Sequence, residues 1–283
     1  MRRSLISIPV AGLMLLIWPA TALAATDPGL GTAANFAVLA GTTITNTGPS
    51  WITGQIGAGA AGIAPGSFPP GAAGPQHVND GVYTQAQTDL TSAFATAVQS
   101  VTTDYTGVNL GGKTLPPGVY NQTTAPTLTG TLTLSGSGIY IFLIGGTLVT
   151  ANSAVISLIN GAQPCQIYWR VVTSATIAPS TAFVGTIMAG AGIQMQTGAT
   201  LFGRALARTA AVTLDTNRII QPSGCGYAAP AYVAPPAGNI LPATLGVPWD
   251  LGSTSWLLVM AVGAGLGATV LVVSNRRRRR RTS

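Results

Sequence analysis

A repeat of about eighteen residues in the second half of the chain constrains the fold more than any other feature. Residues 175–178 and 183–189 are echoed eighteen residues later by 193–196 and 201–207, and 212–215 gives a third echo nineteen residues beyond Ile193. A short fixed period indicates one structural unit stacked on itself. Alternating apolar residues with frequent Gly, Thr and Asn make that unit strands joined by tight turns. We therefore predict a three-faced β-solenoid, whose flat surface is more typical of a binding template than of a catalytic cleft.

One segment departs from the strand pattern and predicts a helix. Its apolar residues are spaced as on one face of a helix, and they are Ala86, Leu90, Ala93, Phe94, Ala97, Val98 and Val101. Either Asn79 or Asp80 can cap its N-terminus. We expect one long helix over about 79–102, lying along a solenoid face, with strands on both sides of it in the sequence.

The N-terminus has the features of a secretory signal peptide. A basic start is followed by an apolar run from Leu5 to Pro19 and by the small-x-small pattern that ends at Ala24. The alternative is a membrane helix that is retained, although Pro9 and Pro19 interrupt the run. We predict that residues 1–24 are removed on export and that the exported body spans residues 25–225.

The C-terminus predicts a membrane anchor. Residues 256–273 are apolar except for Thr269, a length that just spans a hydrocarbon core of about 30 Å. Six arginines, 276–281, follow and are expected to stay in the cytoplasm. We therefore assign residues 226–253 to a Pro/Ala/Gly-rich spacer, 254–274 to a transmembrane helix and 275–283 to a cytoplasmic tail, with the body held outside the cell.

A sortase-like pattern precedes the predicted span. Leu241, Pro242, Ala243 and Thr244 resemble a cell-wall sorting signal, but Leu245 stands where that pattern requires glycine. We prefer a retained membrane anchor, and attachment to the cell wall is the alternative.

The net charge of +7 reflects the chain ends and not the body. Between residues 25 and 221 five basic residues balance five aspartates, and the chain contains no glutamate. A neutral body argues against a nucleic-acid partner. Its uncharged polar surface suits ordered water or a neutral polymer.

The two cysteines and the scarcity of titratable residues limit the chemistry. Cys165 and Cys225 both lie in the exported segment, where disulfides persist, so we predict that they pair. The only histidine is His77 and no Cys-x-x-Cys spacing occurs, so we expect no metal site. No pair of carboxylates falls within a repeat, so we expect no cofactor and no enzymatic activity.

Several motifs, in order along the chain, resemble the secreted ice-binding proteins of the DUF3494 type. They are residues 30–41, 45–49, 115–120, 158–162 with Cys165 and Trp169, 203–208 and 212–215. The resemblance covers about residues 29–222. It implies a discontinuous right-handed β-solenoid of triangular section, all-β apart from one long helix packed alongside. It also implies that the protein binds ice through one flat face.

Successive side chains of a strand point alternately into and out of the coil, and this parity predicts which of them form that face. Val212 and Leu214 are apolar and point inward, so Thr213 and Asp215 point outward. Applied to each repeat, this rule selects Val149, Thr176, Ala178, Gln194, Gln196, Thr213 and Asp215. We expect them to form two columns with strands about 4.8 Å apart. The alternative hypothesis is a surface adhesin or structural protein that binds a glycan or a protein through the same face.

Overall fold

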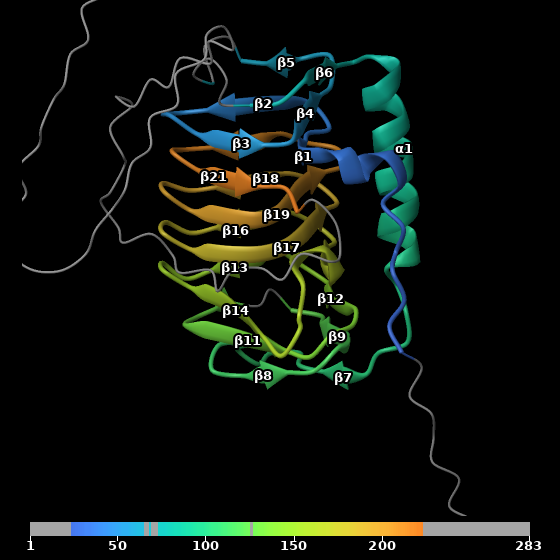
Figure 1. The fold of residues 1–283 in the computed structure, drawn as a ribbon, viewed down its shortest axis with the longest axis vertical. Coiled ribbons are helices and arrows are strands. Elements are labelled where there is room, and N and C mark those ends of the chain that lie inside the picture. The colour runs from blue at the N-terminus through green and yellow to red at the C-terminus, as the bar shows by residue number, and fades with distance from the viewer. Residues whose placement is uncertain (1–23, 65–67, 69–72, 125–126, 223–283) are drawn as a thin grey trace, which may run out of the picture. The chain divides into compact units, whose positions relative to one another are not determined.

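The alternating apolar residues close the chain into a three-faced β-solenoid (Figure 1). The computed structural model describes residues 24–64, 68, 73–124 and 127–222. Every strand pairing in this part of the chain is parallel. The predicted spacer, membrane span, cytoplasmic tail and sorting-like motif lie outside the described residues, as does nearly all of the predicted signal peptide.

One face, which we call the helix face, carries the only described α-helix. Its strands follow the order β6 (Gln76–Val78), β4 (Gln55–Ala58), β1 (Phe36–Leu39), β19 (Thr200–Ala207), β17 (Ala182–Ala189), β15 (Ile167–Val171), β12 (Tyr140–Ile144), β9 (Gly118–Gln122) and β7 (Thr103–Asp104).

A second face shares two long strands with the helix face. It is formed by β8 (Thr114–Leu115), β11 (Thr131–Ser135), β14 (Val155–Ile159), the first residues of β17 and β19, β21 (Arg218–Ile220) and β3 (Trp51–Thr53). The paired Gly185 and Gly203 lie side by side within β17 and β19. A Cβ atom at Gly203 would lie 1.9 Å from the Gly185 carbonyl oxygen, so only glycine fits there.

The third face is a separate seven-stranded sheet. Its order is β10 (Thr127–Leu128), β13 (Leu148–Thr150), β16 (Ala175–Ile177), β18 (Ile193–Met195), β20 (Val212–Leu214), β2 (Thr43–Asn46) and β5 (Gly62–Ile63). Ala175 pairs with Ile193 and Ile193 with Val212. The eighteen- and nineteen-residue echoes therefore correspond to successive turns of the coil.

The coil is discontinuous in sequence. Strands β1, β2 and β3 lie against β19, β20 and β21, so the first turn of the chain stacks on the last described turn. This arrangement places β5 and β6 at one end of the solenoid and β7 and β8 at the other (Figure 1). The expected β-solenoid with one helix is confirmed.

The helix α1 (Gly81–Thr96) runs along the helix face between the two ends (Figure 1). Its N-cap is Asp80, whose carboxylate accepts a hydrogen bond from the Tyr83 N–H (2.8 Å) and contacts His77 Nδ1 (2.8 Å). The helix is shorter than the predicted range of 79–102. The chain has to be extended by Thr102, whose N–H donates to the Val119 carbonyl.

Two apolar clusters hold the helix and the coil together. Inside the coil, aromatic rings of successive turns contact one another. The rings of Phe142 and Trp169 are stacked, with their centroids 3.9 Å apart. Between coil and helix, Leu90 of α1 is fully buried in a cluster that includes Phe36 and Met188. Within the described residues, no helix is both long and apolar enough to cross a membrane.

A carboxylate also fastens α1 to the 3-10 helix η1 (Gly31–Asn35), which packs against it. Asp89 accepts hydrogen bonds from the N–H and the hydroxyl of Thr32, both at 2.7 Å, and from Gln85 Nε2 at 2.8 Å. These donors stabilise the ionised carboxylate. They therefore hold the pKa of Asp89 below its ordinary value.

Candidate functional site

The outward side chains of the seven-stranded sheet are accessible to a ligand. On the helix face, α1 and η1 bury the outward side chains Met188 and Leu206. On the second face, the 3-10 helix η2 (Pro164–Gln166) packs against β17 and β19, where Val184 is only 1% exposed. Elsewhere on that face Thr131 of β11 and Thr53 of β3 stay exposed. On the seven-stranded sheet, the outward residues of the inner strands are half-buried or exposed. This sheet therefore offers a continuous contact surface.

One outward column runs across the sheet from β10 to β2. The strand register aligns Thr127, Val149, Thr176, Gln194, Thr213 and Thr45. Val149, Thr176, Gln194 and Thr213 therefore stack in the order that parity predicted. Sequence reasoning missed Thr45 and Thr127, because their strands belong to parts of the chain without a clear repeat.

Short residues form a second column where the strands begin. Backbone hydrogen bonds run from Leu148 N to Ser174 O, from Ala175 N to Gly192 O and from Ile193 N to Ala211 O. The column comprises Thr147, Ser174, Gly192, Ala211 and Thr43, all of them half-buried. None of these side chains is longer than threonine, so this side of the sheet is flat.

The predicted column on the other side of the sheet falls at a corner of the solenoid, which corrects the expected geometry. Strands β16, β18 and β20 end one residue before Ala178, Gln196 and Asp215. Ala178 is only 6% exposed, and its N–H donates to Thr150 Oγ1 (2.8 Å). The three-residue strands are too short to carry a further column on the flat sheet.

Asp215 is engaged at this corner and does not project from the flat sheet. Its carboxylate accepts hydrogen bonds from the hydroxyls of Thr197 (2.5 Å) and Thr216 (3.1 Å). Gln196 is half-buried beside it. The centre of the face therefore presents methyl groups, hydroxyls and one amide, without a charged side chain.

The layer beneath the face is rigid and dry. The inward residues Ile44, Ile177 and Val212 are fully buried. Every neighbouring pair of strands in the sheet is joined by the backbone hydrogen bonds of parallel pairing. Because the outward groups are held at fixed spacing, little conformational freedom is lost when a flat ligand binds.

Comparisons with known proteins agree with this geometry. A family model described as ice-binding-like matches residues 38–220. The chain belongs to the ice-binding-like family. An ice-binding protein of Nostoc sp. (strain HG1) is 42% identical over 205 residues, which cover 70% of this chain and 76% of that protein.

Two solved structures of ice-binding proteins share the fold. One comes from an Antarctic biological consortium, with 38% identity, a TM-score of 0.64 and coverage of 72% of this chain and 95% of that one. The other comes from the Antarctic ascomycete Antarctomyces psychrotrophicus, with 36% identity, a TM-score of 0.63 and coverage of 69% and 98%.

Metal-ligating side chains and cysteines are the other candidates for a site. Within the described residues, no group of three or more His, Cys, Asp or Glu side chains is placed to hold a metal ion. Cys165 lies in η2, is 8% exposed and is disulfide-bonded. Its predicted partner, Cys225, lies outside the described residues, so that pairing stays a prediction.

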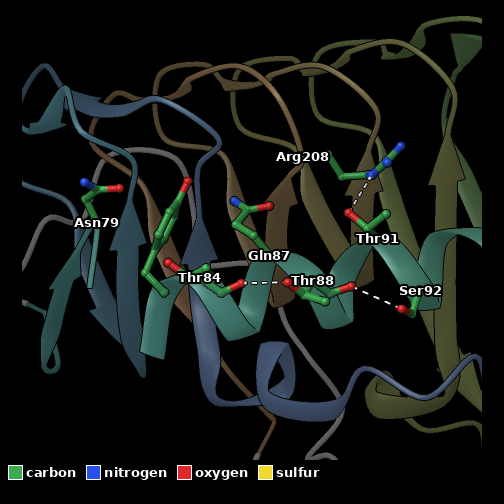
Figure 2. Close-up of a pocket in the computed structure, with 8 residues that line it drawn as sticks. Asn79, Thr84, Gln87, Thr88, Thr91, Ser92 and Arg208 are labelled. Carbon is green, nitrogen blue, oxygen red and sulfur yellow. Dashed lines mark hydrogen bonds between the residues drawn. The ribbon is translucent and has the colours of Figure 1, made fainter. Parts of the chain in front are cut away.

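A groove of about 590 Å³ lies along α1 (Figure 2). It is lined by Asn79, Tyr83, Thr84, Gln87, Thr88, Thr91, Ser92 and Arg208. Thr84, Thr88 and Ser92 donate their hydroxyl hydrogens to backbone carbonyls one turn earlier in the chain. The Arg208 guanidinium lies 4.7 Å from the Phe94 ring centroid, and its Nε donates to Thr91 Oγ1 (3.4 Å). The three hydroxyls are thus engaged within α1, and Arg208 joins the helix to the coil.

Proposed function

We propose that the protein adsorbs to ice through the seven-stranded sheet. The observation that carries this proposal is the accessible pair of columns, in which most residues are short and bear a methyl or hydroxyl group that repeats with the strands. Strands about 4.8 Å apart present these groups as a rigid lattice. Water above them is then ordered before it meets the crystal. Membership of the ice-binding-like family supports the choice of ligand.

The test is ice shaping by purified protein comprising residues 25–225. We expect a single ice crystal grown in its presence to develop facets, and recrystallisation of polycrystalline ice to slow. A folded protein that leaves ice crystals round and does not slow recrystallisation would contradict the proposal. It would favour the alternative of an adhesin that binds a glycan or a protein through the same sheet.

We also propose that the protein works at the cell surface, anchored by residues 254–274 with the tail inside. The sequence supports this through the apolar span and its six arginines. Near the start of the described residues, Thr26 is hydrogen-bonded to Gln99, just beyond α1. The last described residue, Pro222, follows β21 of the second face, and its carbonyl accepts a hydrogen bond from Arg204. Neither Thr26 nor Pro222 lies on the seven-stranded sheet.

Protease treatment of intact cells tests the anchored arrangement. We expect protease added outside to remove the solenoid and to leave the arginine tail attached to the membrane. Antibodies against each part distinguish the fragments. A solenoid that is protected from protease until the cells are opened would contradict this topology.

A further inference from the structure

Gln194 interrupts an otherwise flat face. It stands in the outward column on β18, between Thr176 on β16 and Thr213 on β20. On the inner strands β13, β16, β20 and β2 the outward residues of this column are half-buried, whereas Gln194 is exposed. The neighbouring column contains no side chain longer than threonine. Gln194 is therefore the side chain that projects from the middle of the lattice.

The side chain of Gln194 has no partner that holds it down. Within the described residues, its amide makes no hydrogen bond, whereas the corner residue Asp215 is engaged by two hydroxyls. A free glutamine samples many rotamers and loses this freedom when a flat surface presses on it. The surface reaches the shorter groups on the neighbouring strands, which lie about 4.8 Å away, only after this side chain has folded down.

We propose that Gln194 limits the strength of ice adsorption, an inference that rests on the proposed function of this sheet. Gln194→Thr produces an uninterrupted threonine run over β16, β18, β20 and β2. The exchange leaves the interior unchanged, because the inward neighbours Ile193 and Met195 are 2% and 1% exposed. Threonine also suits a strand better than glutamine does, so the fold is preserved.

The experiment compares wild type with Gln194→Thr and with a matched control, Gln76→Thr. Gln76 is an exposed glutamine on β6, at the end of the helix face. Recrystallisation inhibition and thermal hysteresis are measured over a protein concentration series, with unfolding curves to show that each variant is folded. We expect Gln194→Thr to act at about a tenfold lower concentration than wild type, a factor equivalent to about 1.4 kcal/mol. Gln76→Thr should match wild type.

Two further outcomes separate this inference from the proposed function. If wild type inhibits recrystallisation and Gln194→Thr is equal or weaker, the inference is wrong while ice binding stands. If neither wild type nor Gln194→Thr acts on ice, the proposed function fails and the inference fails with it. A third variant, Gln194→Ala, should also gain activity, because the inference attributes the limit to the projecting amide.

Discussion

Replacing Thr213 by tyrosine tests the ice-binding face most directly. Thr213 is half-buried on β20, flanked by Gln194 on β18 and Thr45 on β2. Its inward neighbours Val212 and Leu214 are fully buried and are not touched by the change. Substitutions at such surface positions change the free energy of unfolding by about 0.5 kcal/mol or less. We therefore expect Thr213→Tyr to fold normally.

The expected loss of activity follows from the spacing of the strands. A tyrosine ring on β20 holds a flat crystal surface away from β20 and from the adjacent β2, so the methyl contacts of Thr213 and Thr45 are both lost. At about 0.8 kcal/mol for each methyl group removed from liquid water, the loss is about 1.6 kcal/mol. This corresponds to roughly a fifteenfold higher protein concentration for the same inhibition of recrystallisation.

The assay is a concentration series of recrystallisation inhibition, with Thr131→Tyr as the matched control. Thr131 is an exposed threonine on β11 of the second face. Thr200, which parity also places on another face, is unsuitable because it is only 9% exposed. If Thr213→Tyr retains full activity and Thr131→Tyr loses it, the wrong face has been assigned.

Three further predictions concern the framework that keeps the face flat. Leu90→Ala should lower the free energy of unfolding by about 2–5 kcal/mol in a denaturant titration, since Leu90 is fully buried between α1 and the coil; a loss below about 1 kcal/mol would mean that the helix contributes little. Gly203→Ala should destabilise by about 3 kcal/mol or more in the same titration, because its Cβ would collide with the Gly185 carbonyl; wild-type stability would show that the strand bend relaxes easily. Asp89 has a lowered pKa in the folded protein, so its contribution to stability is present above its unfolded pKa and is lost as the pH falls through the folded pKa. The melting temperature of Asp89→Asn should therefore fall less than that of wild type between about pH 5 and pH 3, and parallel curves would rule out this role.

Local patterns in the sequence determined much of the fold. The eighteen-residue period predicted stacked turns, and strict alternation within them predicted which residues of β16, β18 and β20 point outward. Both features depend on the two-residue period of a strand, which any short segment carries. The helix was predicted in the same way, although its end was placed six residues too late, after Thr96.

The extent of the site was decided by the tertiary structure. Thr45 and Thr213 are neighbours in the register, yet they lie at opposite ends of the described chain, and no local period relates them. The corners that remove Ala178 from the flat sheet depend on where the coil closes. Which outward side chains are covered depends on where α1 and η2 pack. Alternation shows only that a side chain points outward. Whether it then meets solvent, a helix or a corner depends on contacts between segments far apart in the sequence.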